Sequence, residues 1–308
     1  MSATQKSEEA GMKYFILGAF SSAFFVYGAA LVFGATGSTN LQAIFEAAGA
    51  AMAGETSATF LLLSGAALMF VGLGFKVAVV PFHMWTPDVY EGAPTPVTAF
   101  MSIAAKVGGF TALMRVLVVG MTTLTLREGE PAAWLNTLQL VAIATLLLGN
   151  FVALAQTNMK RLLAYSSIAH AGYMLMAVAA AAQPGVANTA AQAMMVYFVA
   201  YMFTNIGAFG VVLALEKEDG SGTDINDFAG LYNTRPLMAI AMAVFMFSLT
   251  GIPLTAGFLG KWLIFGAAVQ AGLIPLVIIG VLTSVVSAFY YVRVIVQMFL
   301  QTETVGSE

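Results

Sequence analysis

The sequence contains no cysteine, only two histidines and few charged residues, which make up 9% of its 308 positions. Without cysteine, the chain forms no disulfide, binds no iron–sulfur cluster through thiolates and has no nucleophilic thiol. Neither histidine has a second histidine or a carboxylate at metal-ligand spacing, which argues against a metal or haem centre. The net charge of −3 and the lack of a Lys/Arg-rich run give no indication of nucleic-acid binding. We therefore expect no cofactor, metal or nucleic-acid partner for this chain.

Hydrophobic residues are in excess, at 60% of the chain. Because a transmembrane helix needs about 20 apolar residues, the chain has room for about eight spans and only short connections. This excludes a large soluble catalytic domain. The composition predicts an all-α, polytopic protein that lies in the lipid bilayer.

Eight apolar stretches long enough to cross a bilayer follow one another along the chain. They run roughly over residues 14–34, 58–82, 97–120, 133–155, 161–182, 191–215, 237–269 and 273–300. We expect residues 1–13 to form a polar, solvated lead-in and residues 301–308 a polar tail. Residues 14–300 are then a single transmembrane domain.

Positive charge predicts the orientation, because Lys and Arg concentrate in short cytoplasmic loops. With a cytoplasmic N-terminus, the cytoplasmic side collects Lys6, Lys13, Lys160, Arg161, Lys217, Arg235 and Arg293, and the opposite side Arg115 and Arg127. We therefore expect both termini in the cytoplasm.

Two of the eight stretches are interrupted. The stretch 237–269 would measure roughly 50 Å as one helix, against a hydrocarbon core of about 30 Å. Gly251 and Pro253 predict a break in its middle, and Pro81 predicts a break in the stretch 58–82. Non-helical backbone at membrane depth is tolerated only where protein or water satisfies its polar groups, so both breaks indicate a hydrated interior.

The paired interruptions also predict an internal repeat. Interrupted helices in corresponding positions are typical of transporters built from inverted repeats. We expect an antiporter-like bundle with an incomplete first repeat over residues 14–120 and a second repeat over residues 133–300.

Three lysines lie inside apolar stretches, namely Lys76, Lys106 and Lys261. An ionisable residue near the centre of a span costs about 2.5 to 3.5 kcal/mol on insertion scales and by default marks a functional pathway. Burial disfavours the ammonium form, so such a lysine is able to release and accept protons near neutral pH. The alternative is that each lysine snorkels to the surface or only packs. The spans hold no carboxylate cage at mid-depth, which argues against a sodium or organic-substrate site.

Other polar residues fall along the same stretches. His83 follows the Pro81 break and His170 lies deep in its span; each is either a proton relay or a hydrogen-bonded core residue. Asp88 and Glu91 either cap a helix or gather protons at an entrance, with the structural role favoured. Candidates for holding water or joining helices are Tyr165, Ser166, Ser167, Tyr173, Thr204 and Asn205.

Three segments resemble signatures of the antiporter-like membrane subunits of respiratory complex I, the NADH:quinone oxidoreductase. They are residues 75–97 (FKVAVVPFHMWTPDVYEGAPTPV), 158–170 (NMKRLLAYSSIAH) and 251–261 (GIPLTAGFLGK). They occur in the family's order over nearly the whole chain. A lysine rather than a glutamate at position 261 is more similar to the subunit N branch of bacterial enzymes than to subunit M.

This resemblance implies a pair of proton half-channels in a bacterial inner (cytoplasmic) membrane. Lys76 and Lys261 would be the lysines of the two broken helices, and Lys106 the connecting lysine. His83 and His170 would belong to a central hydrated axis. Quinone reduction elsewhere in the complex would supply the energy. Other subunits would carry the FMN and the iron–sulfur clusters, and the partners of this chain would be other membrane-arm subunits and lipid.

The resemblance begins at the family's sixth span, so we expect an N-terminally truncated member. The helix that carries the family's glutamate partner of Lys76 would then be missing, and Glu8 and Glu9 do not fit that role. We expect another chain to supply this glutamate. Two other interpretations stay open: a subunit of a multi-subunit cation/proton antiporter, and a structural remnant that does not pump.

Overall fold

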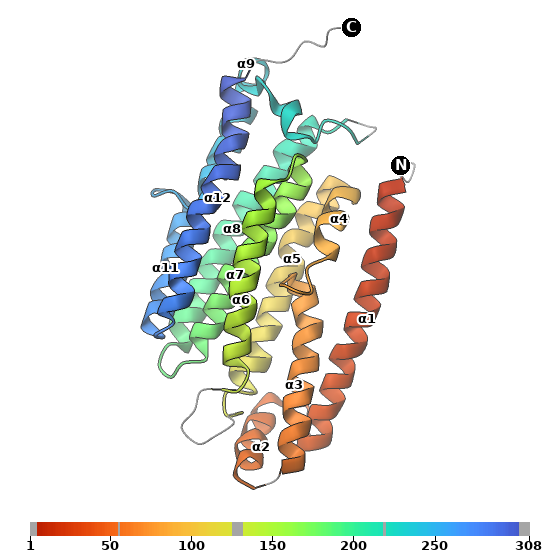
Figure 1. Ribbon diagram of the computed structural model, residues 1–308, viewed down its shortest axis with the longest axis vertical. Helices are drawn as coiled ribbons and strands as arrows, with labels where there is room; N and C mark the ends of the chain where they lie inside the picture. The colour runs from red at the N-terminus through yellow and green to blue at the C-terminus, as the bar shows by residue number, and fades with distance from the viewer. Residues whose placement is uncertain (1–4, 55, 125–131, 218–219, 302–308) are drawn as a thin grey trace.

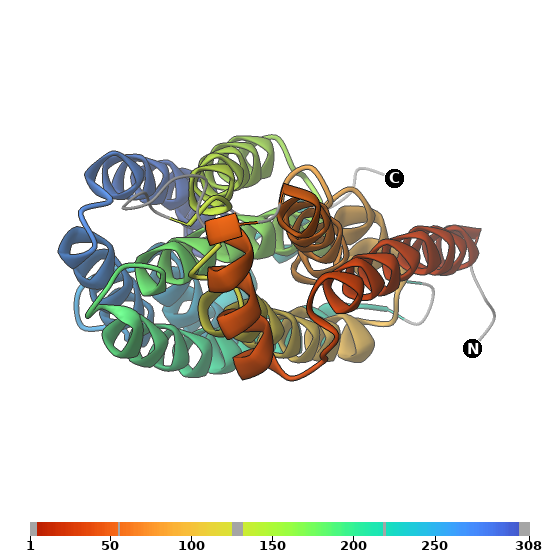
Figure 2. The same ribbon diagram turned by 90° about the horizontal axis from the view of Figure 1, so that it is seen from below.

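The computed structural model describes residues 5–54, 56–124, 132–217 and 220–301, and their regular elements are all helices. Arg127 and the expected tail after residue 301 lie outside the described residues. Figure 1 shows an elongated bundle of roughly parallel helix axes. Viewed end-on, α1 lies at one end of the cross-section and α11 and α12 lie at the other (Figure 2).

Twelve α-helices and two short irregular helices make up the described residues. Their bounds are α1 Gln5–Thr36, α2 Leu41–Gly54, α3 Thr56–Val77, α4 Trp85–Gly92, α5 Thr95–Leu113, the π-helix η1 Met114–Val119, α6 Leu135–Leu154, α7 Met159–Ala181, α8 Ala187–Leu215, the 3-10 helix η2 Ile225–Phe228, α9 Leu231–Thr234, α10 Pro236–Thr250, α11 Ala256–Gln270 and α12 Ile274–Leu300.

Each of the eight predicted stretches is helical. Seven helices of the described chain are long and apolar enough to cross a membrane, and the stretch 237–269 is divided into α10 and α11. Two features differ from expectation. Residues 5–13 continue α1 as its first turns. Helix α2, which packs beside α1 and α3 at the lower end of Figure 1, has 14 residues and is too short to register as a span.

Both predicted breaks are present. Helix α3 ends at Val77, Ala78 has a left-handed φ of 61°, and the Trp85 indole at the start of α4 donates to the Phe75 carbonyl at 2.9 Å. Helix α10 ends at Thr250, where Gly251 adopts φ 86° as the residue after the helix. Glycine reaches this conformation without the steric cost that a Cβ adds, which explains the stop at this position.

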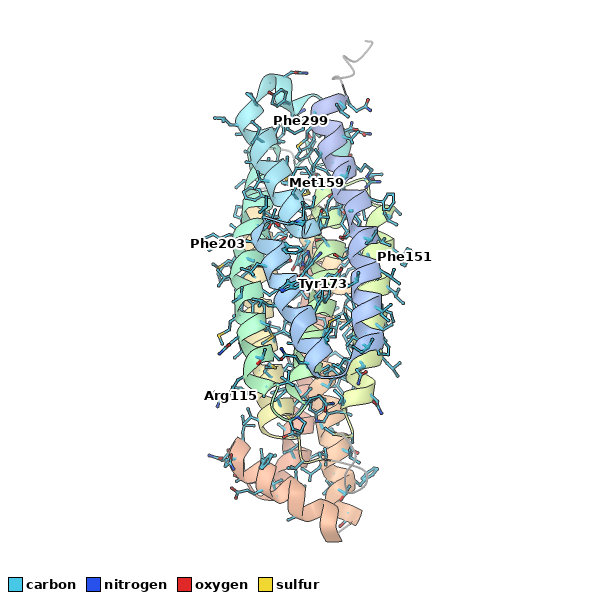
Figure 3. All side chains as sticks on the ribbon, turned by 90° about the vertical axis from the view of Figure 1, so that its left-hand side faces the viewer. Arg115, Phe151, Met159, Tyr173, Phe203 and Phe299 are labelled. Atoms are coloured by element: carbon cyan, nitrogen blue, oxygen red, sulfur yellow. The ribbon has the colours of Figure 1, made fainter. Side chains whose placement is uncertain are left out.

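Helix α7 runs through the interior of the bundle. Nearly all of its residues are buried, because α4, α6, α8 and α11 pack around it. Tyr173 on α7 lies inside the bundle, whereas Phe151 and Phe203 point outward on opposite sides (Figure 3). A helix shielded in this way holds polar side chains without exposing them to lipid, and α7 carries several.

Candidate functional site

Lys106 on α5 is buried, with 2% of its surface exposed. Its Nζ donates to the Val77 carbonyl at 3.0 Å and to the Ser167 carbonyl at 2.9 Å. Val77 is the last residue of α3, so its carbonyl belongs to the negative end of a helix that stops at the first break. The ammonium therefore joins the first break to the interior of α7.

Lys261 on α11 makes the same kind of contact at the second break. It is 4% exposed, and its Nζ donates to the Thr250 carbonyl at 2.7 Å and to Ser284 Oγ at 2.8 Å. Thr250 ends α10. The ammonium also stands 4.9 Å from the centre of the Tyr173 ring, a favourable cation–π distance. Each of these two lysines thus binds the last carbonyl of a helix at its interruption.

His170 on α7 lies between the two lysine sites and is 5% exposed. Its Nδ1 hydrogen-bonds with the Tyr197 hydroxyl at 2.5 Å and its Nε2 with the Tyr291 hydroxyl at 3.2 Å. The Tyr291 hydroxyl pairs in turn with Ser166 Oγ at 2.5 Å. A neutral imidazole donates from one nitrogen and accepts at the other, so the ring connects the two tyrosines in one chain of exchangeable protons.

A small cavity separates His170 from Lys261. It has room for about one water molecule and is lined by His170, Tyr197, Ala200, Tyr201, Thr204, Ser248, Leu249, Gly257 and Lys261. The Tyr201 hydroxyl is buried and has no hydrogen-bond partner among the described residues. Thr204 Oγ1 and Ser248 Oγ pair at 3.1 Å in the same wall. Buried hydroxyls of this kind bind ordered water, which would bridge histidine and lysine.

Lys76 and His83 lie apart from this chain of contacts. Lys76 is exposed, and its Nζ donates to the Tyr14 hydroxyl at 3.3 Å, 5.8 Å from the centre of that ring. His83 is half-buried in the first break, and its Nδ1 has no partner among the described residues. The structure therefore brings together three of the five predicted site residues, Lys106, His170 and Lys261.

Several polar residues of the site were missed by sequence reasoning, notably Tyr197, Tyr201, Ser248, Ser284 and Tyr291. The spacing of these residues in the sequence could have identified them. Tyr197, Tyr201 and Thr204 recur at helical spacing along α8, and Ser284 and Tyr291 do so along α12. Polar residues repeated at three, four or seven positions in an otherwise apolar helix share one face.

Asp88 and Glu91 on α4 belong to an ion-pair cluster at the end of the bundle. Lys6 contacts Glu91 at 2.8 Å and Lys13 contacts Asp88 at 2.6 Å, both from α1. Arg161 of α7 contacts both carboxylates, at 2.7 and 2.9 Å. The cluster ties α4 to α1 and α7, in line with the favoured structural role.

The ion pairs also set the protonation of the two carboxylates. Partial burial raises the pKa of Asp88, but hydrogen bonds from Lys13 and Arg161 outweigh it and hold this pKa below the ordinary value of 3.8. The pKa of Glu91 is likewise lowered from 4.5, because hydrogen bonds from Lys6 and Arg161 outweigh burial. Both groups are therefore ionised at neutral pH.

The chain belongs to the family described as NADH:quinone oxidoreductase/Mrp antiporter, TM, whose model matches residues 1–287. Among its relatives, NADH-quinone oxidoreductase subunit N 2 of Roseiflexus castenholzii is 50% identical over 299 residues, with 96% of this chain and 58% of the relative covered. Subunit N of Chloroflexus aggregans is 49% identical, with 97% and 59% covered. The resemblance stated from the three motifs is confirmed, and so is the all-α, antiporter-like fold class.

Chains of solved membrane complexes have the same fold as this chain. A chain of respiratory complex I from Thermus thermophilus superimposes with a TM-score of 0.81 at 39% identity, with 98% of this chain and 62% of that chain covered. A chain of the Mrp complex from Dietzia sp. superimposes with a TM-score of 0.83 at 27% identity, with 98% and 53% covered. This chain thus spans less than two thirds of the length of these relatives. The comparisons do not support the expected N-terminal truncation.

Acid is expected to loosen the ion-pair cluster. Because both carboxylates have lowered pKa values, their stabilisation is complete above the ordinary values and is lost as pH falls through the lowered ones, below about pH 4. The thermal midpoint of the purified protein in detergent should therefore fall by a few degrees between pH 7 and pH 3.5.

Asp88→Asn tests the assignment. It should lower the midpoint at pH 7 and shrink the acid-induced drop, whereas Glu46→Gln, at an exposed position of α2, should change neither. An equal acid-induced drop in wild type and Asp88→Asn would show that other groups cause it.

Proposed function

We propose that this chain is a proton-translocating membrane subunit of a bacterial NADH:quinone oxidoreductase, a multi-pass protein of the cytoplasmic membrane with both termini in the cytoplasm. Family membership and the relatives named subunit N support this assignment. The observation that carries it is the pair of buried ammonium groups, Lys106 and Lys261, each at a helix break, with the hydrogen-bonded His170 on α7 between the two sites.

Protons would pass along this axis in steps between neighbouring groups. A lysine releases a proton as ammonium and accepts one as amine, and hydroxyls and imidazole both donate and accept. The hydrogen-bonded part of the route begins at Ser166, next to the Ser167 carbonyl that binds Lys106, and runs through Tyr291 and His170 to Tyr197. The small cavity lies between this part and Lys261. The chain itself makes and breaks no substrate bonds. Quinone reduction and the flavin and iron–sulfur chemistry would take place in other subunits of the complex. The direct partners of this chain would be other membrane-arm subunits.

A second candidate is a subunit of a multi-subunit cation/proton antiporter. The structural likeness to a chain of the Mrp complex favours it, since that likeness extends over 98% of this chain. The two candidates share the proton axis and differ in the partners. Purification of the native assembly separates them: flavin and iron–sulfur subunits support the first, and sodium/proton exchange without them supports the second.

Lys106→Ala tests the role of the axis. It is expected to lower proton pumping by about a hundredfold, the lower end of the range for loss of a proton-transfer group, while the assembly still forms. The measurement is proton uptake per NADH oxidised in proteoliposomes. Lys217→Ala, at an exposed position, is the matched control and should pump normally. Unchanged pumping in Lys106→Ala would favour the structural-remnant interpretation.

We also propose that a glutamate of another chain approaches Lys76 in the working assembly. An exposed lysine at membrane depth needs a partner, and Tyr14 offers only a neutral hydroxyl. Lys76→Met should therefore weaken pumping, and a structure of the whole assembly should show a carboxylate beside this ammonium. Only apolar neighbours around Lys76 in that structure would contradict the proposal.

A further inference from the structure

A third buried lysine, besides Lys106 and Lys261, lies at the outer end of the polar axis. Lys160 lies in the first turn of α7, and its charge was expected on the cytoplasmic side. Its side chain is only 4% exposed. The Nζ donates to the Ala93 carbonyl at 2.8 Å and pairs with Glu216 at 3.3 Å.

Glu216 gives this lysine a partner of a different kind from those of Lys106 and Lys261. It follows α8 directly, and its side chain is 16% exposed. Its second carboxylate oxygen accepts a 2.5 Å hydrogen bond from the Thr95 hydroxyl at the start of α5. Lys106 and Lys261 bind carbonyl and hydroxyl oxygens. An acid and a base are thus held together near the end of the bundle.

Helix geometry connects this pair to the Lys106 site. Lys160 and Ser167 are seven residues apart on α7, so they lie on one face, two turns or about 10.5 Å apart. The Ser167 carbonyl accepts from Lys106, and Ser167 Oγ pairs with the Tyr90 hydroxyl at 3.5 Å. Between Lys160 and Ser167 on this face stands Ala164, which has a small side chain.

Glu216 is the carboxylate that is left to exchange a proton with Lys160, because the other nearby carboxylates pair with other cations. Arg161, the next residue, pairs with Asp88 and Glu91, and these carboxylates also bind Lys13 and Lys6 of α1. On the α5 side, the Thr95 hydroxyl is neutral and holds Glu216 in place.

We propose that Lys160 and Glu216 form a proton-loading site for Lys106. This proposal rests on the proposed function. Glu216 takes a proton from hydronium at the membrane surface and passes it to the neutral Lys160 amine. An N–H bond of the Lys160 ammonium then breaks, and a proton is relayed through water and hydroxyl groups to form an N–H bond on the neutral Lys106 amine. For each cycle one hydronium becomes water, and Lys106 gains one proton.

Lys160→Arg separates this role from that of a structural ion pair. Arginine keeps the positive charge and the contact with a carboxylate, but it does not release its proton in proteins. A proton-loading role predicts that pumping falls by about tenfold or more while NADH oxidation and assembly persist. Lys217→Arg, at the exposed residue after Glu216, is the matched control and should pump like wild type.

Glu216→Gln provides a second variant in case the larger arginine hinders assembly. Glutamine keeps a hydrogen-bond acceptor for Thr95 but does not titrate, so it should also lower pumping, and Glu216→Asp should restore part of it. Wild-type pumping in an assembled Lys160→Arg or Glu216→Gln protein would overturn the proposal. If Lys106→Ala fails to pump while these variants pump normally, only the loading site is refuted; if Lys106→Ala pumps normally, the proposed function itself fails.

Discussion

The helix breaks depend on one interaction, the contact between a buried ammonium and the last carbonyl of a helix. A membrane-spanning helix that stops in the bilayer leaves carbonyls without an intrahelical partner, and lipid offers them no donor. Lys106 supplies a donor to Val77, and Lys261 supplies one to Thr250. The dependence is mutual, since the negative end of each half-helix also stabilises a cation that lipid would expel. Break and lysine therefore stabilise each other.

The position of α7 extends this local arrangement into an axis of buried polar groups. Because neighbouring helices cover it, α7 presents Ser166, Ser167 and His170 to the interior rather than to lipid. The Ser167 carbonyl binds Lys106, and His170, about one turn further along α7, lines the cavity beside Lys261. A single rigid helix thus sets the spacing between the two lysine sites, and the side chains of α8 and α12 complete the links between them.

Sequence reasoning predicted the helical class, the eight stretches and both breaks, because apolar length, glycine and proline are local signals. It placed Lys106, His170 and Lys261 at depth by counting residues along each span. It did not predict that Lys76 points outward or that Lys160 is buried, since these depend on which face of a helix meets a neighbour. Tyr197 and Tyr291 come from helices distant in sequence, and only the packing of α8 and α12 against α7 brings both hydroxyls to His170.

The same geometry explains why amines rather than carboxylates occupy the two breaks. The oxygen of a terminal carbonyl is an acceptor at the negative end of a helix, so a carboxylate at position 261 would face the Thr250 carbonyl with no proton to donate and with charge of the same sign. An ammonium donates there and is stabilised, and the neutral amine left after proton release still has N–H groups to donate. Both protonation states of the lysine therefore satisfy the break, which lets a proton leave and return without stranding the carbonyl.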